Sequence, residues 1–209
     1  MNVKHSMILA AGAFSLAACE NPADKTKSAA VSDAVSVEIT APAAAAIAYT
    51  FAPESEIHFV GSKLTGKHAG GFKSFSGEFA IADGKLAGTG QTITIDMNSI
   101  WSDNEKLTGH LKNEDFFNVA KFPQSTFELT GVSAGENNTY QVSGNLTLLE
   151  TTKNITFPAT VTIDGGAASI HAKFDINRKD FGVVYAGMPD DLIRDEVVIE
   201  LKLKAVPKG

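Results

Sequence analysis

From Tyr49 onward, apolar and polar residues alternate along eight short stretches, and this alternation limits the possible folds more than any other feature. A period of two puts the apolar side chains on one face of a β-strand and the polar ones on the other. Turn-forming residues, such as Asp83-Gly84 and Asp164-Gly165-Gly166, separate neighbouring stretches as they do in hairpins. The pattern predicts an all-β, antiparallel domain. The eight stretches are residues 57–61, 75–81, 86–97, 125–132, 140–148, 155–163, 170–176 and 197–203.

The apolar face of such a sheet must be buried. Two stacked layers and a closed barrel both achieve this, and the alternation agrees with either. Gly61, Gly77 and Gly144 fall on or beside the apolar register, where a missing side chain marks a bend or leaves interior room. An eight-stranded barrel is wide enough to be filled by side chains or to hold one small ligand. On the residues alone, an elongated apolar cavity and a filled core are equally open.

One segment interrupts the alternation, between Asn98 and Thr126. Its apolar residues are four or five positions apart, a spacing that suits one or two helical turns better than a strand. So short a helix is not stable alone and needs an apolar surface to cover. We therefore expect a short helical insert at about 103–118 that caps the sheet. The apolar residues concerned are Leu107, Leu111, Phe116 and Phe117.

The size and charge of the chain exclude several classes of protein. With 209 residues and 44% hydrophobic content, the chain can bury one good core, so residues 49–209 are expected to form one domain. A net charge of −6 argues against a nucleic-acid groove, which requires a basic face. An outer-membrane barrel carries aromatic girdles, whereas this chain has one Trp and three Tyr. The apolar face is therefore predicted to point inward.

The first nineteen residues are predicted to be a processing signal. Lys4 and His5 give a weakly basic start, residues 7–14 are apolar, and small residues precede the only cysteine, Cys19. Leu16-Ala17-Ala18-Cys19 is similar to a bacterial lipobox, which implies export and lipidation of Cys19; an ordinary secretory signal is the alternative. Two or more acyl chains on Cys19 would anchor the protein stably to a membrane at the periplasmic face of the cell envelope.

The next segment, residues 20–48, is predicted to be a flexible tether. It is rich in Ala, Ser, Thr and Pro and contains no aromatic residue, so it has little apolar surface to offset the entropy of ordering. Glu20 directly after the cysteine favours the outer membrane, by resemblance to sorting patterns. The folded domain is expected to begin close to Tyr49.

Motifs for catalysis and metal binding are incomplete. Residues 131–135 match the glycine-serine-glycine pattern of a nucleophile elbow, but here a strand leads into a polar hairpin and not into a helix. The five histidines lack the spacing of a metal site. We therefore expect no enzyme, no metal and no cofactor.

A few cationic side chains are candidates for contact with a ligand headgroup. Lys67 and His68 are expected in one loop and His110 in the helical insert; if they meet at one mouth, they offer cations to an anionic or quinone-like headgroup. Ordinary loop charges are the alternative. Arg178 is a further candidate, with a salt bridge to a nearby aspartate as the plainer explanation.

Five segments in a fixed order together resemble the YceI-like family, the polyisoprenoid-binding bacterial proteins of lipocalin-like shape. The resemblance covers almost all of residues 49–206. It implies an extended eight-stranded antiparallel barrel whose apolar lumen holds an isoprenoid chain, such as an isoprenoid quinone or a polyprenyl phosphate. The segments are GSKLTGKHAGGF at 61–72, IDMNSI at 95–100, KLTGHLKNEDFFNVAKFPQSTFE at 106–128, YQVSGNLTLLETTKNITFPA at 140–159 and INRKDFGVVY at 176–185.

The leading hypothesis is therefore a lipid-anchored protein that binds, stores or transports an isoprenoid lipid without catalysis. One alternative is an envelope stress-protective or interaction module with a filled barrel. Another is an enzyme that acts on an isoprenoid, with His68 or His110 as acid or base. The sequence leaves open whether the protein forms a homodimer. The side chains expected to line the lumen are Phe59, Phe75, Phe79, Ile93, Ile95, Met97, Phe116, Phe117, Phe127, Leu129, Phe157, Phe174 and Phe181.

Overall fold

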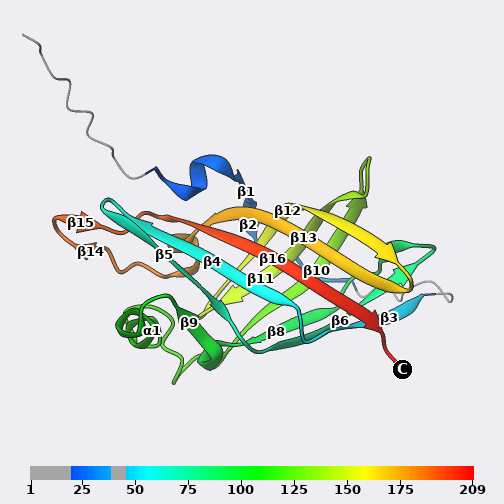
Figure 1. Cartoon of the computed structure of the whole chain (residues 1–209), viewed down its shortest axis with the longest axis horizontal. Coiled ribbons are helices and arrows are strands. Elements are labelled where there is room, and N and C mark those ends of the chain that lie inside the picture. Colours follow the sequence, from blue (N-terminus) through cyan, green and yellow to red (C-terminus); the bar gives the residue numbers. More distant parts are fainter. Residues whose placement is uncertain (1–19, 39–45) are drawn as a thin grey trace, which may run out of the picture.

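The computed structural model describes residues 20–38 and 46–209. They form a closed, eight-stranded antiparallel barrel with one short helix (Figure 1). The predicted fold class is thus confirmed, and two stacked layers are excluded. The predicted signal peptide, the predicted lipidation site Cys19 and part of the predicted tether, residues 39–45, lie outside the described residues.

Eight segments of chain run up and down around the barrel, and a bend divides each of the first three into two strands. The bent segments are β3 (Ile47–Phe51) with β4 (Glu56–Lys63), β5 (Gly66–Phe72) with β6 (Phe75–Ala82), and β8 (Thr92–Asp96) with β9 (Ile100–Ser102). The other five are β10 (Gln124–Ala134), β11 (Thr139–Leu148), β12 (Thr151–Asp164), β13 (Ala167–Asn177) and β16 (Glu196–Pro207).

The last strand closes the barrel. One edge of β16 pairs with β13 and the other edge pairs with β4 and β3. Ile199 of β16, for example, lies opposite Phe174 on one side and Phe59 on the other. Closure removes the free edges that would otherwise attract other strands.

The remaining short elements lie in the connections. They are β7 (Lys85–Ala87), β14 (Gly187–Met188), β15 (Asp191–Leu192), the helix α1 (Glu105–Leu111) and the 3-10 turns η1 (Pro22–Lys25), η2 (Met97–Ser99) and η3 (Arg178–Phe181). Figure 1 shows α1, the β14–β15 hairpin and the turn between β4 and β5 at one end of the barrel, here called the helical end, and the chain terminus at the other.

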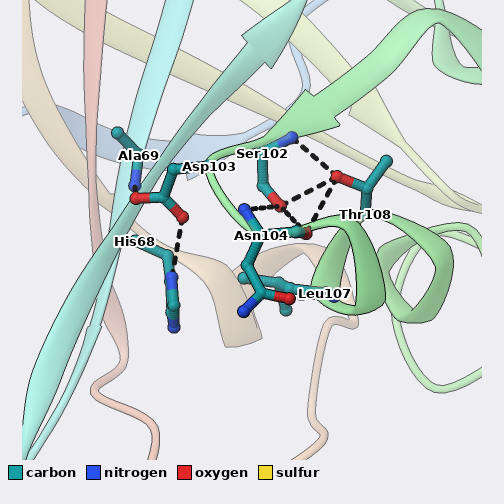
Figure 2. Close-up of polar contacts among 7 residues, drawn as sticks. All are labelled: His68, Ala69, Ser102, Asp103, Asn104, Leu107 and Thr108. Carbon is teal, nitrogen blue, oxygen red and sulfur yellow. Dashed lines mark hydrogen bonds and ion pairs between the residues drawn. The ribbon is translucent and has the colours of Figure 1, made fainter.

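The helical insert is shorter than the predicted 103–118, because α1 covers only Glu105–Leu111 and turns follow it. The side-chain oxygen of Asn104 accepts the Leu107 N–H at 3.1 Å, which caps the start of the helix. The Ser102 N–H donates to the hydroxyl of Thr108 at 2.8 Å and ties the helix to β9 (Figure 2). These bonds fix the insert against the barrel.

Part of the predicted tether is a structured part of the sheet. Strand β1 (Lys27–Ser28) pairs with β13, and strand β2 (Ala30–Asp33) pairs with β12. They occupy the gap that opens where β12 and β13 stop pairing with each other, at Ala159 and Ala172. Ala29 between them is buried. The expectation of a flexible tether is therefore wrong for these residues. The apolar pattern is too short to detect, and its partners lie more than a hundred residues away in sequence.

The predicted loop that carries Lys67 and His68 is a strand, β5. Its glycines resembled loop residues, but they have another cause. A Cβ atom on Gly70 would lie 2.4 Å from the ring of Phe59 and 2.4 Å from the carbonyl oxygen of Trp101. Glycine is therefore required here because β5 packs closely against its neighbours.

Candidate functional site

The barrel encloses an apolar cavity of about 270 Å³. Cavities of about 150 Å³ already bind benzene, and small-molecule pockets begin near about 300 Å³. On β16 the lining residues alternate from Val197 to Leu203. At about 3.3 Å per residue, this stretch of strand is about 20 Å long. The barrel therefore holds an elongated lumen, which decides between the two interiors that the residues alone left open.

Twelve of the thirteen side chains predicted to face the lumen do line it. Phe181 does not, because it is fully buried in the core cluster that contains Phe157 and Phe174. It lies in the turn η3, after the strand period has ended, so the alternation no longer predicts its direction. Phe51 and Phe72 also line the lumen but were not predicted to do so, because the alternation did not indicate strands at β3 and β5.

One side of the lumen, the packed wall, is made by β11, β12 and β13. Of its lining side chains, Val142, Ile155, Phe157 and Phe174 are buried, and Leu146, Leu148 and Ile170 are partly buried. The rings of Phe157 and Phe174 stack with their centroids 4.2 Å apart. Aromatic contacts of this kind are worth about 0.5–1.5 kcal/mol beyond the area they bury. The packed wall is thus a continuous hydrophobic core.

The opposite side, the open wall, is made by β4, β6 and β8. Of its lining side chains, Phe59, Phe75, Ile93 and Ile95 are partly buried, whereas Ile57 and Phe79 are buried. A Cβ atom on Gly61 would meet no other atom within 4 Å, so unoccupied space adjoins this glycine. Open space is therefore left beside this wall, while side chains of both walls line the lumen.

Gly144 in β11 has the opposite surroundings. A Cβ atom there would lie 2.1 Å from the Cζ atom of Phe127, so this glycine makes room for a phenylalanine ring. That ring contacts Phe157 with its centroid 5.8 Å away. Gly61 and Gly144 were predicted together as interior glycines, and the structure gives them different roles.

Four polar side chains touch the cavity: Glu78, Gln91, Ser125 and Arg178. Glu78 forms an ion pair with Lys208. The Ser125 hydroxyl donates to a backbone carbonyl at 2.7 Å. The side-chain oxygen of Gln91 is buried and has no hydrogen-bond partner within the described part of the chain. Gln91 therefore offers a polar point of contact to a ligand.

Arg178 is the only one of the four predicted headgroup residues that lines the lumen. Its side chain is 6% exposed and forms an ion pair with Asp195 at 3.5 Å. Burial lowers the pKa of the guanidinium, and the charge of Asp195 opposes this effect. The guanidinium also donates to the backbone carbonyls of Val183, Ile193 and Arg194, at 2.6, 3.4 and 3.0 Å. It therefore holds the loop between η3 and β16 in place.

Lys67 and His68 do not line the lumen. As neighbours on one strand they point to opposite faces, so they do not both face one opening. The ring of His68 lies 2.7 Å from the Asp103 carboxylate, as Figure 2 shows. Asp103 also accepts the Ala69 N–H at 2.9 Å. This hydrogen bond has the largest effect in lowering the pKa of Asp103, and the hydrogen bond to His68 lowers it by less. The His68 ring thus fastens β5 to the start of the insert.

His110 does not line the lumen either. Its ring packs between Phe116 and Tyr185, at centroid distances of 5.0 and 5.1 Å. Its Nε2 atom lies 2.8 Å from the Asp115 carboxylate. The expected mouth formed by Lys67, His68 and His110 is therefore not present in this arrangement.

Neither a metal site nor a membrane-spanning helix is found in the described ranges, 20–38 and 46–209. No three His, Cys, Asp or Glu residues there come close enough together to hold a metal ion. No helix there has both the length and the apolar character needed to cross a membrane.

A closed up-and-down barrel of eight strands around an apolar lumen is the architecture of the lipocalin-like binding proteins. The model of the YceI-like domain matches residues 49–205, and the chain belongs to this family. A UPF0312 protein of Yersinia pestis (strain Pestoides F) is 33% identical over 156 residues, which cover 69% of this chain and 80% of the relative. The resemblance found in the sequence is thus confirmed.

Solved structures give the same result. BcnA of Burkholderia cenocepacia superposes with a TM-score of 0.65 and 26% identity, over 73% of this chain and 97% of that one. A polyisoprenoid binding domain from Saccharophagus degradans, implicated in plant cell wall breakdown, has a TM-score of 0.62 and 20% identity, over 78% and 99% of the two chains. At that identity the second likeness shows the fold alone.

Proposed function

We propose that the protein binds an isoprenoid lipid non-covalently in the lumen, and stores or carries it at the cell envelope. The single observation that supports this most strongly is the elongated apolar cavity inside the barrel. The structural neighbour described as a polyisoprenoid binding domain adds support for the class of ligand.

Affinity for such a ligand comes mainly from its hydrocarbon chain. Each methylene group that leaves water contributes about 0.8 kcal/mol, so a chain of several prenyl units needs little polar recognition. Contacts to a headgroup then tune selectivity. Both an isoprenoid quinone and a polyprenyl phosphate carry a suitable chain.

The proposed role is binding without chemistry. Of the polar side chains at the lumen, Glu78, Ser125 and Arg178 are engaged by other groups of the protein. Such groups hold the fold in place and are poorly available as acid, base or nucleophile. Lipidation of Cys19 and a periplasmic, outer-membrane location remain part of this proposal.

The test fills the lumen. Gly61→Leu places a side chain in the unoccupied space beside the open wall, whereas Gly109→Leu makes the same chemical change on the exposed surface of α1. We expect organic extracts of the gently purified natural protein and of Gly109→Leu to contain an isoprenoid lipid, and extracts of Gly61→Leu to lose most of it. Mass spectrometry measures the lipid, and circular dichroism confirms that all three proteins are folded.

Two results together would contradict the proposal. One is that no isoprenoid co-purifies with any of the three proteins. The other is that an added isoprenoid quinone leaves the melting temperature of the natural protein unchanged, because a ligand that binds only the folded state must raise it.

A further inference from the structure

Three large apolar side chains are exposed together at the helical end of the barrel. Leu64 is 51% exposed, Met188 63% and Leu192 46%. Leu64 lies in the turn between β4 and β5, and the other two lie on the β14–β15 hairpin. Figure 1 shows both hairpins projecting from the same end. These three residues are here called the apolar tip.

Specific contacts join the two hairpins. The Leu64 N–H donates to the Leu192 carbonyl at 3.3 Å. The Asp191 carboxylate forms an ion pair with Lys63 and accepts the Thr65 hydroxyl at 2.9 Å. The tip is therefore one fixed surface; the ion pair neutralises Asp191 and Lys63, and the exposed Asp190 stands between Met188 and Leu192. Single exposed apolar residues are common on proteins, but a group of them marks an interaction site.

The start of the described chain lies near this tip. Glu20 forms an ion pair with Lys25 at 2.5 Å. The Thr26 hydroxyl, directly after η1, donates to the Asp175 carboxylate at 2.6 Å, so this start lies beside the end of β13 that leads into η3 and the β14–β15 hairpin. One residue spans at most about 3.6 Å, so a lipid on Cys19 would start within a few ångströms of Glu20.

The loop that carries part of the tip also borders the lumen. Val183 and Ile193, on either side of the β14–β15 hairpin, line the cavity. Arg178 holds both of their carbonyls. The loop between η3 and β16 therefore contributes residues both to the tip and to the lining of the lumen.

We propose that the apolar tip inserts into the surface of a phospholipid bilayer, on the membrane that holds the anchor, and turns the helical end of the lumen toward the lipid. The tip and the predicted anchor lie at the same end of the barrel, which favours a bilayer over a second copy of the chain. The inference rests on the proposed function for the nature of the cargo.

The experiment measures insertion directly. The full chain is purified from membranes and reconstituted into phosphatidylcholine vesicles with brominated acyl chains, which quench tryptophan fluorescence on contact. A tryptophan is introduced by Met188→Trp in a Trp101→Phe background. The matched control is Val206→Trp, at a residue that is 43% exposed on the far end of β16.

We expect Met188→Trp to lose most of its emission in these vesicles and Val206→Trp to keep it. Adding Leu64→Ser and Leu192→Ser to Met188→Trp should restore the emission, since those changes remove the rest of the tip.

An unquenched Met188→Trp protein would overturn the inference. So would a dimer, observed in detergent by sedimentation, that Leu192→Ser converts to monomer, because the tip would then be covered by a second copy. Extraction of the same samples separates this result from the proposed function. An isoprenoid that is retained by an unquenched protein rejects only the tip, whereas quenching without any bound isoprenoid rejects only the cargo.

Discussion

The packed wall and the open wall of the barrel share one sequence pattern, but their side chains have different surroundings. Both alternate apolar and polar residues, and both place phenylalanines toward the interior. On the packed wall these rings contact each other and are buried, as with Phe157 and Phe174. On the open wall Phe59 and Phe75 also contact rings, those of Phe72 and Phe51, but they stay partly exposed at the lumen.

This difference shows how one barrel meets two requirements. Close-packed side chains supply the stability of a domain, because dispersion contacts and apolar burial need neighbours. A lumen needs the reverse, namely apolar surface without neighbours. We infer that the packed wall carries most of the stability and the open wall carries the binding. The predictions below test this division.

The largest effect is expected for Phe157→Ala, on the packed wall. The substitution removes a buried ring that contacts both Phe127 and Phe174, and should lower the free energy of unfolding by about 3–5 kcal/mol. Phe75→Ala is the control on the open wall, and should cost less because its ring is only partly buried, whereas Phe157 is 5% exposed. Urea denaturation measures both. Equal losses would mean that the two walls do not differ in stability.

The second prediction makes the same change at two interior glycines. Gly144→Ala forces the ring of Phe127 aside and should cost about 1–3 kcal/mol. Gly61→Ala meets no atom within 4 Å and should be neutral, or stabilise by up to about 1 kcal/mol, because alanine reduces the freedom of the unfolded chain. Thermal unfolding compares them. A loss at Gly61 as large as that at Gly144 would contradict the open wall.

The third prediction concerns the segment that fills the gap between β12 and β13, beside the packed wall. The Thr26 hydroxyl donates to the buried Asp175 carboxylate at 2.6 Å. Thr26→Val leaves that carboxylate without this bond and should cost about 1–2 kcal/mol. Faster hydrogen exchange at the amides of β1 and β2 would show it. Ser28→Ala, at an exposed residue, is the control and should leave exchange unchanged.

The smallest effect is expected at Asp103, away from both walls. Hydrogen bonds lower its pKa in the folded protein, so the carboxylate stabilises the fold above the unfolded pKa, near about 4. This contribution should be lost as the pH falls through the folded pKa. The pair with His68 is largely exposed, so the effect should stay below about 1 kcal/mol.

Asp103→Asn should therefore be less stable than the natural protein at neutral pH and equally stable in acid. Urea titrations at several pH values measure the difference. A gap that stays constant down to the lowest pH would show that the ionised carboxylate is not its source.

Three parts of the fold could not be predicted from the sequence, and each has a physical reason. The close approach of β5 to Phe59 and Trp101 demands glycine at Gly70, and glycine hides the strand pattern. Strands β1 and β2 are too short to show a pattern, and their partners are supplied by a gap between two distant strands. Phe181 follows the end of a strand, where alternation no longer sets direction.

The sequence by itself determined which side chains face inward, because alternation is a property of each strand and needs no partner. It therefore predicted twelve of the lining residues, whereas the barrel was implied by the resemblance to the YceI-like family, because alternation agrees equally with two stacked layers. Only the tertiary structure decided where the interior is packed and where it is hollow. That depends on which side chains meet across the closed barrel, as when Phe127 occupies the space left by Gly144 while nothing fills the space beside Gly61.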